Sequence, residues 1–74
     1  MATTLCFDFG NTRLKCGVFE DGQLKEVVTL ENDHDDTILS LVEKYRPASS
    51  LLSSVINHNP KMEEILSAAG KFHL

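Results

Sequence analysis

Residues 3–20 have the sequence TTLCFDFGNTRLKCGVFE, and this stretch decides the fold. Apolar residues alternate with other residues on both sides of Gly10-Asn11, which is the period of a β-strand. Glycine adopts a positive φ angle without steric cost and asparagine tolerates the left-handed region, so this pair predicts a tight two-residue hairpin turn. The chain is therefore expected to open with two antiparallel strands, over residues 3–9 and 12–20.

Beyond these strands the pattern changes from strand to helix. Asp21-Gly22 indicates a second hairpin turn, and residues 23–30 form a third expected strand. Asp35 or Asp36 is expected to cap the N-terminus of an amphipathic helix. The apolar stripe of this helix consists of Ile38, Leu41, Val42 and Tyr45.

The last third of the chain predicts a strand, a helix and the start of another strand. The apolar segment 50–56 is typical of a buried strand. Asn59 is the expected N-cap of the second helix, with Pro60 at its first position and Gly70 as its C-terminal stop. Residues 72–74 begin the final strand. The predicted order is β-β-β-α-β-α-β, which makes an α/β fold with a mixed sheet and helices packed on it.

Charge and composition exclude several classes of protein. The 74 residues carry 7 basic and 11 acidic side chains, for a net charge of -4, and have no run of lysine or arginine. A nucleic-acid binder needs such cations to displace counterions from phosphates, so no nucleic-acid partner is expected. The N-terminus resembles neither a signal peptide nor a membrane span, so we expect a cytoplasmic protein without membrane contact. Cys6 and Cys16 lie in apolar segments and are expected to be buried free thiols.

Residues 8–15, DFGNTRLK, concentrate the side chains that can carry chemistry. A two-residue turn would place Asp8 opposite Arg13 and would put both on one face of the sheet together with Lys15. One interpretation is an ordinary hairpin with a cross-strand ion pair between Asp8 and Arg13. The other is a phosphate-binding hairpin, in which Lys15 or Arg13 neutralises phosphate oxygens and Asp8 holds Mg²⁺ directly or through water.

The backbone of the same turn fits the second interpretation. The N–H groups of Gly10, Asn11 and Thr12 can donate to phosphate oxygens, and the Thr12 hydroxyl is a further donor. Ser53 or Ser54, at the end of the predicted fourth strand, can line a cleft beside them or serve only in packing.

Two competing motifs are weaker. Residues 8–10 copy the Asp-Phe-Gly triplet of protein kinases, but none of the other kinase segments accompanies it. Residues 32–36, NDHDD, look like a calcium loop but lack its glycine and its terminal glutamate. We expect that segment to be a solvated loop that caps a helix.

At DFGNTRLK the sequence resembles the N-terminus of the type III pantothenate kinases, a family that includes the Bvg accessory factor proteins. The shared pattern is a short apolar strand followed by DxGNTxxK. The likeness continues through the Asp-Gly turn and through Leu-Ser-Ser-Val at residues 52–55, which is similar to the family's Ser-Ser-Val segment. It covers essentially all 74 residues.

The resemblance implies an actin-like, ribonuclease-H-like domain that binds ATP across a cleft with a second such domain. Residues 1–74 would be the N-terminal part of the first domain, incomplete at its C-terminus, and the second domain would be absent. The family transfers the γ-phosphate of ATP to pantothenate in coenzyme A synthesis. It uses Mg²⁺ and a monovalent cation, K⁺ or NH₄⁺, and works as a homodimer.

The resemblance also assigns roles to residues. Asp8 would be the catalytic, metal-associated carboxylate. The phosphate-binding hairpin would consist of Asp8, Phe9, Gly10, Asn11, Thr12, Arg13, Leu14 and Lys15, with Arg13 at a variable position. The general base, the monovalent-cation site and the adenosine pocket belong to downstream motifs, so this piece alone is expected to be inactive.

Two other functions remain open from the sequence. One is a nucleotide-responsive transcriptional regulator of the Bvg accessory factor kind, which would not be an enzyme. The other is another kinase of the superfamily that contains acetate kinase, the heat-shock chaperone ATPases and actin.

Overall fold

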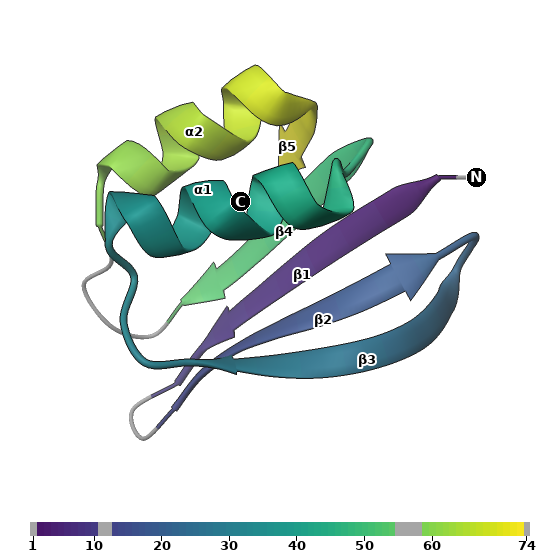
Figure 1. Cartoon of the computed structure of the whole chain (residues 1–74), viewed down its shortest axis with the longest axis horizontal. Helices are drawn as coiled ribbons and strands as arrows, with labels where there is room; N and C mark the ends of the chain where they lie inside the picture. The colour runs from purple at the N-terminus through teal and green to yellow at the C-terminus, as the bar shows by residue number, and fades with distance from the viewer. Residues whose placement is uncertain (1, 11–12, 55–58, 74) are drawn as a thin grey trace.

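The computed structural model describes residues 2–10, 13–54 and 59–73 of the chain. Their elements follow the predicted order and run from the purple N-terminus to the yellow C-terminus in Figure 1. The strands and helices are β1 (Thr3–Phe9), β2 (Leu14–Glu20), β3 (Gln23–Leu30), α1 (Asp35–Tyr45), β4 (Ser49–Ser54), α2 (Lys61–Ala69) and β5 (Lys71–His73). The expected α/β fold is therefore confirmed.

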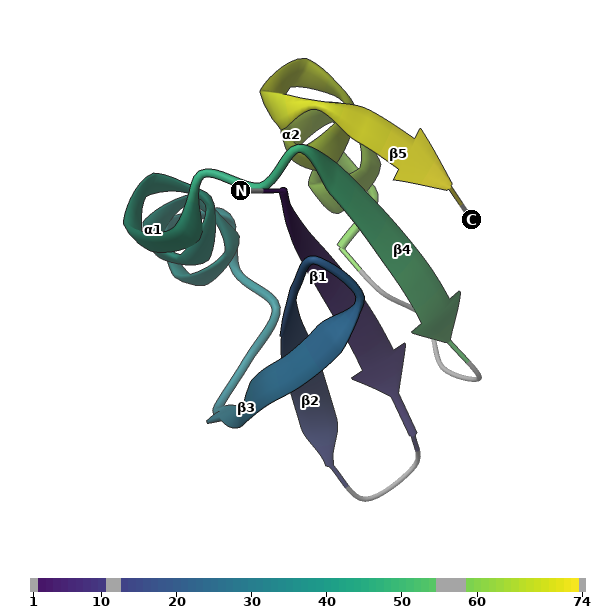
Figure 2. The ribbon, with the colours of Figure 1, turned by 90° about the vertical axis from the view of Figure 1, so that its right-hand side faces the viewer.

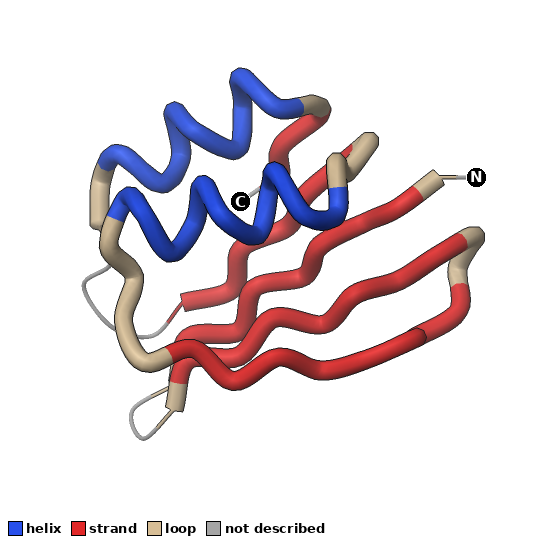
Figure 3. The backbone as a smooth tube through the Cα atoms, viewed as in Figure 1, coloured by secondary structure: helices blue, strands red, loops and turns tan. Residues whose placement is uncertain are grey.

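All five strands form one mixed sheet in the order β3-β2-β1-β4-β5, which can be followed in red in Figure 3. The pairs β1–β2 and β2–β3 are antiparallel, whereas β1–β4 and β4–β5 are parallel. The change falls at β1, because the first three strands are joined by hairpins and the later strands return through helices. Strand β1 therefore lies at the centre of the sheet.

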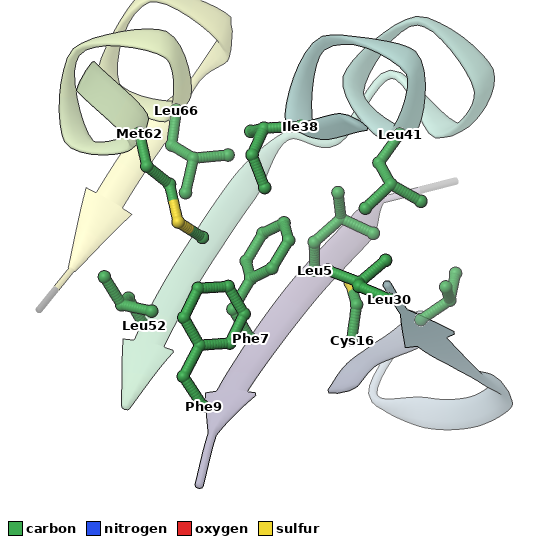
Figure 4. Close-up of a cluster of buried hydrophobic side chains, with 11 residues drawn as sticks. Leu5, Phe7, Phe9, Cys16, Leu30, Ile38, Leu41, Leu52, Met62 and Leu66 are labelled. Atoms are coloured by element: carbon green, nitrogen blue, oxygen red, sulfur yellow. The ribbon is translucent and has the colours of Figure 1, made fainter. Parts of the chain in front are cut away.

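Both helices pack side by side on one face of this sheet (Figures 1 and 2). Strand β1 contributes every second side chain to the core beneath them, as its alternating sequence predicts. In Figure 4 these side chains face those of α1 and α2. The buried core consists of Leu5, Phe7, Phe9, Cys16, Val18, Leu30, Ile38, Leu41, Leu52, Met62 and Leu66. We call this side of the sheet the covered face.

The opposite side, which we call the open face, has neither α1 nor α2 packed on it (Figure 2). The register joins Val27, Gly17, Cys6 and Leu51 in one row across four strands of this face. Val27 is 56% exposed and Leu51 is 42% exposed. Neither described helix is long and apolar enough to cross a bilayer.

The predicted two-residue turn after β1 is wrong. Phe9 pairs with Leu14, and the Gly10 N–H donates to the Arg13 carbonyl oxygen at 3.1 Å, so four residues, 10–13, separate the paired strands. The described Gly10 does not have the positive φ angle that the turn prediction required. The predicted register paired Phe7 with Leu14, whereas the structure pairs Phe9 with Leu14 and Phe7 with Cys16, so the apolar side chains stay on the covered face in both.

The predicted N-cap of α1 is also wrong. His34 occupies that position without a side-chain cap, and Asp35 and Asp36 lie in the first turn. The Asn32 side-chain oxygen accepts the His34 N–H at 3.0 Å and the Thr37 hydroxyl at 2.6 Å, which holds the chain as it enters the helix. The two first-turn carboxylates still favour this end of the helix through its dipole.

Helix α2 begins one residue later than predicted. Pro60 is its N-cap, and the Asn59 side-chain oxygen accepts the Lys61 N–H at 3.1 Å. Gly70 ends the helix as predicted, and a Cβ atom there would lie 2.6 Å from the Ala48 carbonyl oxygen. The strand predicted over 50–56 is observed as β4, and positions 55–58 lie outside the described residues.

Candidate functional site

The predicted site lies where β1 ends and the chain turns into β2. Asp8 is exposed on the open face, and its two neighbours in the strand are buried on the covered face. The rings of Phe7 and Phe9 are 1% and 0% exposed and meet edge to face, with centroids 6.1 Å apart. Because side chains of a strand alternate between its two faces, burial of these rings leaves the Asp8 carboxylate pointing to the open face. The buried rings before and after Asp8 hold its backbone in place.

A row of polar side chains crosses the open face at this point, and we call it the polar row. It consists of Thr29 on β3, Lys15 on β2, Asp8 on β1 and Ser53 on β4. Residues opposite one another in register point to the same face, and all four are exposed. Within the row, the carboxylate is flanked by an ammonium group on one side and by a hydroxyl group on the other.

The predicted partner of Asp8 is therefore wrong, although the predicted face is right. Asp8 lies opposite Lys15, and Arg13 lies before the start of β2. The interpretation as an Asp8–Arg13 cross-strand pair fails for this reason. A shift of two residues leaves each side chain on its original face, so the expected charged face is preserved.

The remaining residues of the octapeptide fall into four groups. Phe9 and Leu14 face the core, so only their backbone can meet a ligand on the open face. Arg13 is exposed, and Asn11 and Thr12 lie outside the described residues. The Gly10 N–H is bonded within the turn, so it is not the free phosphate donor that we expected. The site that the described residues form is thus carried by side chains more than by backbone.

Ser53 is the residue whose position the sequence could not decide. Its register opposite Asp8 follows from the parallel pairing of β1 with β4, two strands that are far apart in the chain. The sequence held one signal that Ser53 would come near Asp8, namely the predicted strand–helix–strand unit. Such a unit implies parallel pairing, and parallel strands bring their carboxyl ends to the same edge of a sheet. Thr29 was missed entirely, since it joins the row only through the β2–β3 register.

Asp8 supplies a single carboxylate, so a Mg²⁺ ion here would need further ligands. Among residues 2–10, 13–54 and 59–73, no group of three or more His, Cys, Asp or Glu side chains could form a metal site. Mg²⁺ is commonly bound by one or two carboxylates, with phosphate oxygens and waters completing its shell. Asp8 beside Lys15 fits that arrangement.

The calcium-like segment at residues 32–36 has a structural role in the fold. The Asp33 carboxylate accepts the Asn59 backbone N–H, and the Asn59 side-chain amide donates to the Asp33 carbonyl and to the Asp35 carboxylate. These bonds tie the start of α1 to the start of α2. The segment is thus a structural loop, as expected, but it joins the two helix starts and does not cap α1 with a carboxylate.

The two thiols lie on neighbouring strands but on opposite faces. Cys16 is buried in the core, whereas Cys6 is half-buried on the open face, so the prediction of burial is confirmed only for Cys16. Burial raises the pKa of Cys16 to about 12, with smaller contributions from Cys6 and the Glu26 carboxylate. Burial also raises the pKa of Cys6. Cys16 is therefore protonated at neutral pH and is not a nucleophile.

No family model matches this chain, and a search of curated proteins finds no significant match. A function must therefore be inferred from three features of the molecule itself. These are the polar row, the octapeptide that supplies half of it, and the topology that brings Ser53 to Asp8.

Proposed function

We propose that this chain is the N-terminal, phosphate-binding part of a type III pantothenate kinase. The observation that carries the proposal is the placement of Asp8 and Lys15 within the DxGNTxxK pattern. Both side chains are exposed and lie opposite one another on the open face, Asp8 near the end of the central strand β1 and Lys15 near the start of β2. A carboxylate and an ammonium group side by side can bind the metal and the phosphates of Mg²⁺·ATP together.

The finer fold assignment, an actin-like domain of the ribonuclease-H type, belongs to the same proposal. It is supported by three antiparallel strands followed by two helix–strand units that are parallel to β1. In such mixed sheets, ligands bind beyond the carboxyl ends of the parallel strands. Asp8 and Ser53 lie at that end of β1 and β4.

In this proposal Asp8 and Lys15 have different roles in phosphate binding. Asp8 would hold the metal, and Lys15 would neutralise charge on the phosphate oxygens. Mg²⁺ would supply stabilisation of the charge that develops during phosphoryl transfer. The rest of the proposed parent enzyme would supply the sites for pantothenate and for the monovalent cation, either K⁺ or NH₄⁺. It would also contain the second domain and the contact with a homodimeric partner. This enzyme would work in the cytoplasm.

A coupled assay of the full-length parent with pantothenate and Mg²⁺·ATP tests the proposal. We expect ADP release that depends on pantothenate. A folded parent that binds ATP without pantothenate-dependent turnover would favour the regulator of the Bvg accessory factor kind, and phosphorylation of a different acceptor would favour another kinase of the superfamily.

The isolated 74-residue chain provides a second check. It contains one side of the proposed cleft, so we expect no turnover and only weak ATP binding by titration calorimetry. Micromolar affinity would show that the nucleotide site is complete within these residues, and that the division between two domains is wrong.

A further inference from the structure

Two consecutive serines at the end of β4 differ in their surroundings. Ser53 pairs with Asp8 and is exposed on the open face, whereas Ser54 pairs with the buried Phe9 and is only partly exposed. Leu52, 4% exposed on the covered face, sets this alternation along the strand. Strand β4 therefore presents the hydroxyl of Ser53, and not that of Ser54, on the same face as the Asp8 carboxylate.

The two strands that carry Ser53 and Asp8 lie side by side, with their carboxyl ends at the same edge of the sheet (Figure 2). Neighbouring strands are about 4.8 Å apart, so two side chains that are in register on one face can bind the same small ion. Burial of Phe7 and Leu52, which are also paired in this register, holds both backbones in place from the covered face. Ser53 and Asp8 are therefore positioned to share a ligand.

The other neighbours of Asp8 on the open face do not suit Mg²⁺. Lys15 lies opposite Asp8 on β2, and Cys6 lies two positions earlier on β1. An ammonium group has no lone pair to offer a metal, and a thiol is a soft ligand that suits other metals. Of these three neighbours, Ser53 is the one that offers an oxygen atom.

A hydroxyl group beside a carboxylate is a known donor set for Mg²⁺ in phosphate-binding proteins. In the P-loop NTPases, a serine or threonine hydroxyl and an aspartate hold the ion while a lysine contacts the phosphates. The polar row carries the same three kinds of group in the order Lys15, Asp8, Ser53. The carboxylate thus lies between a group suited to phosphate and a group suited to the metal.

We propose that Ser53 is a metal-binding residue, and that its hydroxyl oxygen is the second protein ligand, after the Asp8 carboxylate, of the Mg²⁺ in Mg²⁺·ATP. Lys15, on the other side of Asp8, remains available for the phosphates. Because it assigns a further residue to the same site, this role of Ser53 rests on the proposed function. It also separates Ser53 from Ser54, which the sequence left as alternatives.

Mn²⁺ shares the preference of Mg²⁺ for oxygen ligands and tests the proposal in the ¹⁵N-labelled 74-residue chain. Mn²⁺ is titrated in the presence of excess ATP, and paramagnetic broadening of the amide signals reports binding even where it is weak. We expect saturable broadening that is strongest around Asp8 and Ser53 and weakest at Asp21 in the other hairpin turn. No saturable broadening around Asp8 and Ser53 would overturn the proposal.

Three substitutions test whether the hydroxyl itself binds the metal. Ser53→Ala should weaken Mn²⁺ binding about threefold or more, because it removes one oxygen ligand, and Ser53→Thr should retain most of the affinity. Ser54→Ala is the matched control and should leave the affinity unchanged. Urea unfolding curves establish that each variant keeps its fold. Equal losses in Ser53→Ala and Ser54→Ala, or in Ser53→Ala and Ser53→Thr, would contradict a hydroxyl ligand at this position.

A change of ligand type distinguishes metal binding from a hydrogen bond to phosphate. Ser53→Cys, made in a Cys6→Ala background, puts a soft sulfur atom beside Asp8, so it should weaken binding of Mg²⁺·ATP and favour Cd²⁺. A thiolate-to-cadmium absorption band should appear when Cd²⁺ and ATP are added to this variant. Ser54→Cys in the same background should show no such band. A band of equal strength in both variants, or in neither, would reject metal binding by Ser53.

Failure of this role can be told apart from failure of the proposed function. If Asp8→Asn weakens Mn²⁺ binding about tenfold or more and Ser53→Ala does not weaken it, the role of Ser53 is rejected and the site at Asp8 stands. Pantothenate-dependent turnover is measured on the unaltered parent and involves no variant of Ser53. Its absence in a parent that binds Mg²⁺·ATP through Asp8 and Ser53 would reject the kinase and retain the metal ligand.

Discussion

The two faces of the central strand differ in what they contribute to this protein. On the covered face, Leu5, Phe7 and Phe9 are almost fully buried beneath the helices, whereas on the open face Asp8 is exposed and Cys6 is half-buried. Successive side chains of a strand point to opposite faces, so one short sequence supplies both the core and the proposed site. The burial of the first face fixes the backbone from which the second face presents its polar groups.

The largest expected difference between the faces is in stability. Phe7→Ala removes a ring that is 1% exposed and contacts the core, and should lower the free energy of unfolding by about 3–5 kcal/mol. Asp8→Ala, one residue away, should change it by less than about 0.5 kcal/mol. Urea unfolding followed by circular dichroism measures both. Comparable losses would show that the carboxylate has a structural role.

Strand β4 allows the same comparison with one residue type. Leu52 is 4% exposed on the covered face, and Leu51 is 42% exposed on the open face. Leu52→Ala should cost about 2–5 kcal/mol of unfolding free energy, and Leu51→Ala less than about 1 kcal/mol. If Leu51→Ala were as costly as Leu52→Ala, the open face would be packed against something in solution, and the division into two faces would fail.

The reactivity of the two cysteines also compares the two faces, because Cys16 lies on the covered face and Cys6 on the open face. Iodoacetamide at pH 8 should modify Cys6 before Cys16, because Cys16 is fully buried and burial raises its pKa to about 12. Peptide mass spectrometry over time separates the two rates. Equal rates under native conditions would mean that the buried Cys16 thiol is as accessible to the reagent as the Cys6 thiol on the open face.

The same pKa predicts how stability depends on pH. The Cys16 thiol is neutral in the folded protein, whereas in the unfolded chain it ionises near its usual pKa of 9.0. The free energy of unfolding should therefore fall as pH rises above about 9, and this contribution should level off near 12. Cys16→Ala removes the ionisable group and should flatten that part of the profile, after allowing for its lower overall stability. An unchanged slope would assign the effect to other groups.

Local pattern was enough to predict the elements, and long-range pairing was needed for the site. Strand β1 was predicted to the residue, because strict alternation around Phe7 has only one interpretation. The predicted hairpin register was wrong because turn preference at Gly10 suggested that Gly10 and Asn11 form the loop, whereas Gly10 bonds to Arg13 and Phe9 pairs with Leu14. Since the register moved by two residues, Asp8 and Lys15 stayed on the predicted face.

Contacts between distant segments account for the other misses. Ser53 reaches Asp8 through the parallel pairing of β1 with β4, and no local pattern encodes that register. Asp35, one of the two predicted caps of α1, lies in its first turn, and its carboxylate accepts from Asn59, which precedes the other helix. In both cases the partner is far away in the sequence, so a window of neighbouring residues carries no signal for it.

The most direct test of the central claim is the effect of Asp8→Asn on Mg²⁺·ATP-dependent phosphorylation of pantothenate by the full-length parent. Asp21→Asn is the matched control, because Asp21 is exposed in the other hairpin turn. We expect Asp8→Asn to lower kcat by roughly a hundredfold or more at an unchanged Tm, and Asp21→Asn to retain activity. Substantial activity in Asp8→Asn, or equal losses in the two variants, would contradict the placement of the metal and phosphates at Asp8.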